Sequence, residues 1–88
     1  PLADVVRRTA GTGPRHDDDL KAIRGIGPKL ERLLKDLGIT SFGQIARLEP
    51  DDLAVVADAL GSFPGRIERD DWVGSATRLH AETYGTPL

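Results

Sequence analysis

The sequence "GIGP" at residues 25–28 most constrains the fold, because it places a sharp turn inside a segment with a helical pattern. Glycine adopts backbone angles that a side chain forbids, and Pro28 suits the first turn of a helix, where its missing amide hydrogen has no partner. An apolar stripe with helical spacing follows at Leu30, Leu33, Leu34 and Leu37. The segment therefore predicts two helices that meet at a tight hairpin, with Ile26 pointing into the core.

Capping patterns and apolar spacing predict three helices besides the two of the hairpin. The first hairpin helix begins at about Leu20, and the three further helices begin at about Ser41, Pro50 and Asp70, with the last running to Tyr84. Ser41 and Gln44 form a capping-box pattern, and Gly61 and Gly85 are typical helix stops. The segment "SFPGRIER", residues 62–69, is predicted to be a connection. No alternating strand pattern occurs, so the sequence predicts an all-α fold, a compact bundle of five short helices.

The N-terminal segment, residues 1–17, has a different character. Its first part offers one short helical turn at residues 2–8, and "AGTGPRHDDD" then combines glycine, proline and charge, as linkers do. We expect a flexible N-terminal segment or linker over residues 1–17 and a helical domain over residues 18–85. Pro1 without a preceding methionine hints that the chain was cut from a longer one.

Composition argues against metal chemistry, disulfides and membrane insertion. The 88 residues contain no cysteine and only two histidines, His16 and His80, so a zinc site, a disulfide framework or a cofactor is not expected. The aspartates at residues 17–19 are interpreted as a solvated helix cap. No apolar run approaches the roughly 20 residues that span a bilayer, and we expect a cytoplasmic protein.

Charge is unevenly distributed although the formal net charge is only −2. Between residues 20 and 35 five bases face one acid, Glu31; the bases are Lys21, Arg24, Lys29, Arg32 and Lys35. A later segment carries four acids and no base: Glu49, Asp51, Asp52 and Asp58. One end of the domain is therefore expected to be locally positive and the other negative.

The arrangement "LKAIRGIGPKLERLL" resembles the helix-hairpin-helix motif, in which an apolar residue lies between two glycines at the hairpin tip. Together with "FPGRIERDDWVGSA" it resembles a small bacterial helix-hairpin-helix domain. That domain occurs as a C-terminal extension on the E subunit of NADH-quinone oxidoreductase and on a large-subunit ribosomal protein. The resemblance covers residues 18–81 and implies a tandem helix-hairpin-helix, SAM-like architecture, with a degenerate second hairpin around "LEPDD".

The resemblance implies that free amides at the hairpin hold a nucleic-acid phosphate without reading bases. Here these amides belong to Ile26, Gly27 and Lys29, and Arg24 and Arg32 add positive charge around them. Unpaired N–H groups and the helix dipole favour an anion at any helix N-terminus. The candidate phosphate site is therefore Arg24, Gly25, Ile26, Gly27, Lys29 and Arg32. The alternative is that the hairpin is only a helix connector.

A second set of candidates suits a protein partner: Asp51, Asp52, Arg66, Arg69 and Trp72. Trp72 fits either a core anchor or an exposed contact for a partner. Nothing points to catalysis, since "VGSATR" lacks the second glycine of a nucleophile elbow and no sheltered acid pair is indicated.

The leading hypothesis is a non-catalytic interaction module, the terminal domain of a larger protein, that docks onto a protein assembly. The alternative is weak, sequence-independent binding of DNA or RNA phosphates through residues 25–29. A purely stabilising tail is the third interpretation. The sequence leaves the parent protein, the partner and the oligomeric state open.

Overall fold

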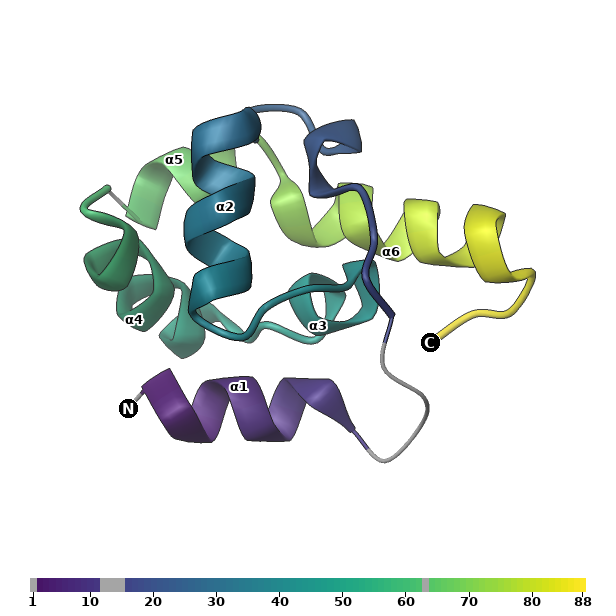
Figure 1. Cartoon of the computed structure of the whole chain (residues 1–88), viewed down its shortest axis with the longest axis horizontal. Coiled ribbons are helices and arrows are strands. Elements are labelled where there is room, and N and C mark those ends of the chain that lie inside the picture. The colour runs from purple at the N-terminus through teal and green to yellow at the C-terminus, as the bar shows by residue number, and fades with distance from the viewer. Residues whose placement is uncertain (1, 12–15, 63) are drawn as a thin grey trace.

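The computed structural model describes residues 2–11, 16–62 and 64–88, and all regular structure in these ranges is helical (Figure 1). The elements are α1 (Leu2–Ala10), the 3-10 turn η1 (Leu20–Ala22), α2 (Pro28–Asp36), α3 (Phe42–Ala46), α4 (Pro50–Leu60), α5 (Pro64–Arg69) and α6 (Trp72–Tyr84). The predicted all-α class is confirmed. The described part contains six α-helices instead of the expected five short helices, because α1 and α5 are added and the first expected helix is only the turn η1.

The hairpin between η1 and α2 forms as the glycine pattern predicts. Gly25 has φ +91°, a left-handed conformation that glycine adopts without the steric cost of a side chain. Ile26 is only 4% exposed and points into the core, and α2 begins at Pro28. These features turn the chain sharply and aim the N-terminus of α2 at solvent.

The core is built by the apolar stripes of all these elements. Its fully buried side chains include Leu20, Ile23, Leu34, Ile39, Ile45, Val56, Ile67 and Trp72. Helices α3 and α6 make the most extensive contact between elements. The leucines of α2 that the pattern assigned to the core are buried or partly buried. Their packing holds α2, and with it the hairpin, against the core.

Helix α1 is longer and better packed than one isolated turn. Val5 and Thr9 are buried, and the helix contacts α3 and α4. Arg8 pairs with Asp52 on α4, and Nη1 of Arg47 donates to the carbonyl of Thr9 at 3.0 Å. Part of the expected linker, residues 12–15, lies outside the described residues, and the domain start at residue 18 stays a prediction.

The expected connection at residues 62–69 is instead largely the helix α5. Helix α5 begins at a proline, which is compatible with the first position of a helix because the amide hydrogen that proline lacks has no acceptor there. Ile67 is 1% exposed and anchors this helix on the core. A single well-buried apolar side chain outweighs the local turn signals of proline and glycine in this segment.

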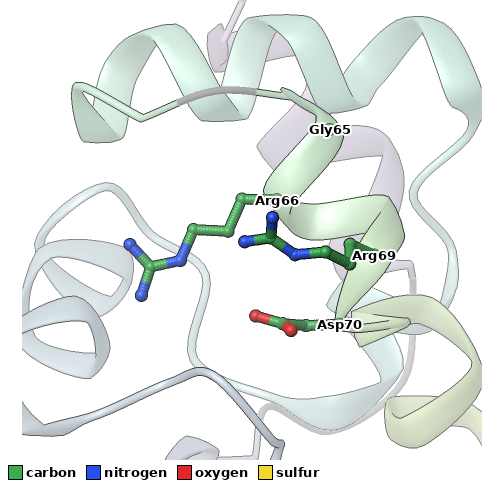
Figure 2. Close-up of a pocket in the computed structure, with 4 residues that line it drawn as sticks. All are labelled: Gly65, Arg66, Arg69 and Asp70. Atoms are coloured by element: carbon green, nitrogen blue, oxygen red, sulfur yellow. The ribbon is translucent and has the colours of Figure 1, made fainter.

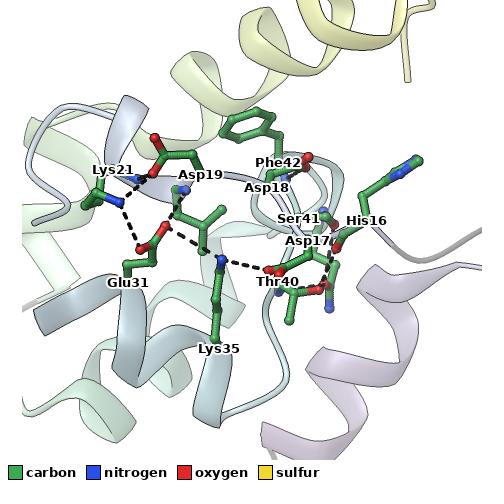
Figure 3. A network of polar contacts seen from close by, with 12 residues as sticks. His16, Asp17, Asp18, Asp19, Lys21, Glu31, Lys35, Thr40, Ser41 and Phe42 are labelled. Atoms are coloured by element: carbon green, nitrogen blue, oxygen red, sulfur yellow. Dashed lines mark hydrogen bonds and ion pairs between the residues drawn. The ribbon is translucent and has the colours of Figure 1, made fainter. Parts of the chain in front are cut away.

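Residues 16–19 are fixed to the domain by a polar network (Figure 3). The backbone amide of Asp18 donates to the carbonyl of Thr40 at 2.8 Å, and its Oδ2 accepts from the amide of Phe42 at 2.8 Å. The hydroxyl of Tyr84 donates to Oδ1 of Asp18, and the His16 ring stacks on that of Tyr84 with centroids 4.1 Å apart. Asp18 is thus a buried structural residue and not part of a solvated cap.

Candidate functional site

The N-terminus of α2 presents backbone donors to solvent. Gly27 is its N-cap and supplies no side-chain cap, and Pro28 has no amide hydrogen. Within the described part of the chain, no acceptor is seen for the amides of Gly27, Lys29 and Leu30. The amide of Ile26 donates to the carbonyl of Ile23 at 3.1 Å. The Ile26 amide, which the sequence predicted as a phosphate donor, is therefore used within the hairpin. The available donors at the start of α2 are the amides of Gly27, Lys29 and Leu30.

Two of the five bases between residues 20 and 35 are neutralised by acids (Figure 3). Nζ of Lys21 lies 2.9 Å from Asp19 and 3.3 Å from Glu31. Nζ of Lys35 lies 2.7 Å from Asp17 and 3.7 Å from Glu31. Hydrogen bonds to Asp19 and then to Glu31 raise the pKa of Lys21, and the bond to Asp17 raises the pKa of Lys35. Both lysines are therefore engaged in ion pairs within the domain.

The other three bases of this segment flank the hairpin and stay available. Arg24, Lys29 and Arg32 are exposed, and none of them pairs with an acid among the residues described. Arg32 lies one helical turn beyond Lys29 on α2, so both side chains belong to one face of the helix. The charge on this side of the domain is therefore positive and unpaired.

The structure brings α5 beside the hairpin. A hollow of ≈ 380 Å³ is lined by Gly25, Gly27, Lys29, Leu33, Leu60 and Arg66, among others. A second hollow of ≈ 670 Å³ is lined by Gly65, Arg66, Arg69 and Asp70. Arg66 lines both, and Figure 2 shows Arg66, Arg69 and Asp70 extending from the backbone to the same side. Two groups of candidates that sequence analysis treated separately thus form one surface.

We call this region the hairpin surface. Its members are Arg24, Gly25, Gly27, Lys29, Arg32, Arg66, Arg69 and Asp70. Asp70 was not predicted as a site residue, and α5 was not predicted as a helix. With that helix known, the spacing i, i+3 and i+4 would have placed Arg66, Arg69 and Asp70 on one face.

Trp72 belongs to the core and not to a contact surface for a partner. Its side chain is 1% exposed, and its Nε1 lies 3.2 Å from the place where a Cβ on Gly25 would be. The interpretation of Trp72 as a core anchor therefore holds. The ring packs next to Gly25, so the first residue of α6 lies against the hairpin tip.

Asp52 is also a structural residue. It is 8% exposed, its Oδ2 accepts from the amide of Glu49 at 2.7 Å, and it pairs with Arg8. Burial favours its neutral form, but the bonds from Arg8 and from the Glu49 amide hold the pKa of Asp52 below its ordinary value. Of the two acids proposed for partner binding, only Asp51 is exposed.

Neither a metal centre nor a membrane span is indicated within residues 2–11, 16–62 and 64–88. This part of the chain has no group of three or more histidine, cysteine or acidic side chains suited to hold a metal ion. Its helices are too short or too polar to cross a bilayer.

A glycine hairpin between two helical elements, within an all-helical core, defines a helix-hairpin-helix domain. The chain belongs to the RS2/RL21/YNQ2 HHH domain family, whose family model matches residues 20–80. The membership predicted from the two sequence blocks is thereby confirmed.

Several relatives share this domain. The chain is 52% identical over 65 residues to large ribosomal subunit protein bL21 of Jannaschia sp. (strain CCS1), with 74% of this chain and 25% of the relative covered. It is 49% identical over 67 residues to an uncharacterized 22.9 kDa protein in the nqo2 3′ region of Paracoccus denitrificans, with 76% and 31% covered. Small ribosomal subunit protein uS2 of Xanthobacter autotrophicus is 43% identical over 72 residues, with 81% and 21% covered.

The chain thus spans less than a third of the length of each of these relatives. No solved structure matches it.

Proposed function

We propose that the chain is a non-catalytic interaction module of a larger protein, and that its hairpin surface binds the sugar-phosphate backbone of nucleic acid weakly and without reading sequence. The observation that carries this proposal is the position of Arg66, which lines both hollows and joins the cations of α5 to those of the hairpin. Three cations line the hollows, namely Lys29, Arg66 and Arg69, and two further exposed cations, Arg24 and Arg32, belong to the segments that form the hairpin.

Phosphate suits this surface better than a protein carboxylate does. A phosphate at the start of α2 can accept from several amides at once, and the dipole of the helix favours its charge. Neighbouring phosphates along a strand repeat that charge, so the arginines of α5 can contact the same ligand. With at most five such contacts, binding is weak and falls steeply with salt, with a log-log slope of about −3 to −5.

The relatives support a role in assemblies of protein and RNA. Two of them carry the names of ribosomal subunit proteins, one from the large and one from the small subunit. A domain attached to different parent proteins fits a portable docking module better than an enzyme. The proposal includes a cytoplasmic location for the parent protein.

Fluorescence anisotropy with labelled RNA and DNA at about 50 mM salt tests the proposal. We expect saturable binding that weakens with salt and is lost in the double variant Lys29→Glu, Arg66→Glu. The matched control is the variant Arg7→Glu, Arg78→Glu, which makes the same change of charge at two exposed bases outside the hollows. Absence of binding by the unaltered chain, or equal loss in both variants, would refute it.

Docking onto a basic protein surface is the second candidate function. The observation in its favour is that Asp51 and Asp58 are exposed on α4, apart from the hairpin surface. A partner that binds through these acids is lost on Asp51→Lys and retained on Lys29→Glu. Asp52→Lys is unsuitable for this test, because Asp52 caps α4 and pairs with Arg8.

A further inference from the structure

We propose that Asp70 makes the hairpin surface selective for RNA over DNA, by accepting a hydrogen bond from a ribose 2′-hydroxyl. The inference rests on the proposed function, because it names which nucleic acid that surface takes. The first observation is that the Asp70 carboxylate lines a hollow whose other charged residues are the cations Arg66 and Arg69.

The Asp70 carboxylate lies against the hairpin tip. A Cβ built on Gly25 would lie 2.3 Å from Oδ2 of Asp70, so the absence of a side chain at Gly25 leaves the space that this oxygen occupies. The backbone of Asp70 is held as well, since its amide donates to the carbonyl of Arg66 at 3.0 Å. The carboxylate therefore lies beside the hairpin tip, on a backbone position that this hydrogen bond holds.

No cation among the described residues neutralises this carboxylate. In the ranges that the structure describes, neither Arg66 nor Arg69 lies within ion-pair distance of Asp70, and its oxygens accept no hydrogen bond from a side chain. Figure 2 shows the carboxylate on the same side of the backbone as both guanidinium groups. It is partly exposed, so a ligand that enters the hollow meets an acceptor as well as two cations.

An unpaired carboxylate repels a phosphate, and a hydrogen bond from a donor on the same ligand offsets this repulsion. The backbone of DNA has none, because its phosphate and sugar oxygens only accept. The backbone of RNA has one donor in each nucleotide, the 2′-hydroxyl, by which proteins distinguish the two polymers. Two cations for phosphates and one acceptor for a hydroxyl therefore match a ribonucleotide strand.

Binding of a short uridine oligomer, its deoxyuridine equivalent and its 2′-fluoro equivalent tests this inference. All three carry the same base, and the 2′-fluoro strand keeps a ribose-like sugar pucker without the hydroxyl donor. We expect the unaltered chain to bind the ribose strand about tenfold more tightly than either other strand. In Asp70→Ala the three affinities should converge, mainly because binding of the two strands without the hydroxyl rises.

Glu68→Ala is the matched control, since it removes one exposed acid of α5 that does not line the hollows. It should raise all three affinities by a similar factor and preserve their ratios. The inference is overturned if the unaltered chain binds the three strands equally, or if Asp70→Ala leaves their ratios unchanged. If no strand binds at all, the proposed function itself fails, and this outcome is distinct from equal binding.

Discussion

The hydroxyl of Tyr84, in the last turn of α6, donates a hydrogen bond to the carboxylate of Asp18, which lies 66 residues earlier in the chain. The other oxygen of Asp18 accepts from the amide of Phe42 at the start of α3. One carboxylate thus joins the segment before η1 to two helices.

Asp18→Ala should lower the free energy of unfolding by about 2–4 kcal/mol, because it leaves the Phe42 amide and the Tyr84 hydroxyl without their charged acceptor. Tyr84→Phe removes only one of these bonds and should cost about 1 kcal/mol. Urea unfolding of both variants measures the difference. Asp17→Ala is the control, since that exposed acid pairs with Lys35 at the surface. A loss in Asp18→Ala no larger than that in the control would contradict the assignment.

Stability should fall between about pH 10 and pH 12 because of Tyr84. Burial and then the bond to Asp18 raise the pKa of Tyr84 to about 12, whereas the phenol titrates near 10 in an unfolded chain. The folded chain holds this proton more tightly, so the contribution is complete below about pH 10 and is lost as the pH rises through about 12. Tyrosinate absorbance follows this titration directly, because Tyr84 is the only tyrosine. Tyr84→Phe should remove this part of the alkaline loss.

Gly25→Ala and Gly27→Ala should differ sharply although both change the hairpin. At Gly25 the φ of +91° is strained for alanine, and its Cβ would meet Oδ2 of Asp70, so we expect a loss of about 1–3 kcal/mol. At Gly27 the φ is −95° and a Cβ meets nothing within 4 Å, so the cost should stay below about 1 kcal/mol. Thermal unfolding of the two variants checks this order, and equal losses would show that the contact with Asp70 is unimportant.

Glu31→Ala should weaken the fold and strengthen polyanion binding at once. Glu31 accepts from the amide of Leu20 at 2.8 Å, and losing that acceptor should cost about 1–2 kcal/mol. The same change releases Lys21 and Lys35 from an acid, which should tighten nucleic-acid binding about threefold at low salt. Asp36→Ala removes an exposed acid from the other end of α2 and should change neither quantity as much. A loss of stability together with a gain in nucleic-acid affinity would show that Glu31 both stabilises the fold and neutralises the two lysines.

Much of the fold follows from the sequence because its signals are local. Leucine spacing and the flanking proline and glycine predict α2, and Ser41 with Gln44 predicts the start of α3, where the amide of Gln44 does donate to Oγ of Ser41 at 3.2 Å. The predictions for α4 and for the end of α6 at Gly85 rest on the same kind of evidence and agree with the structure. Capping and periodicity act within a few residues, so they are visible in the sequence itself.

What the sequence does not reveal depends on distant contacts. The local pattern predicts a connection in place of α5, because nothing local shows that Ile67 becomes buried. Asp52 has the sequence context of a surface acid, because its pairing with Arg8 depends on where α1 lies. The proximity of Arg66 to the hairpin also depends on distant contacts, since only packing of the core brings α5 beside the start of α2. Sequence analysis therefore finds most charged members of the candidate site but not their common surface.

The position of α1 decides from which side the domain can be attached. Gly38, just beyond the end of α2, lies against Val6 of α1, whereas the hairpin lies at the opposite end of α2 (Figure 1). The nine residues of α2 separate these ends by about 13 Å. A polypeptide joined ahead of α1 would therefore approach the domain from the end remote from the glycines. A strand of nucleic acid and the attached protein could then occupy opposite ends without steric conflict.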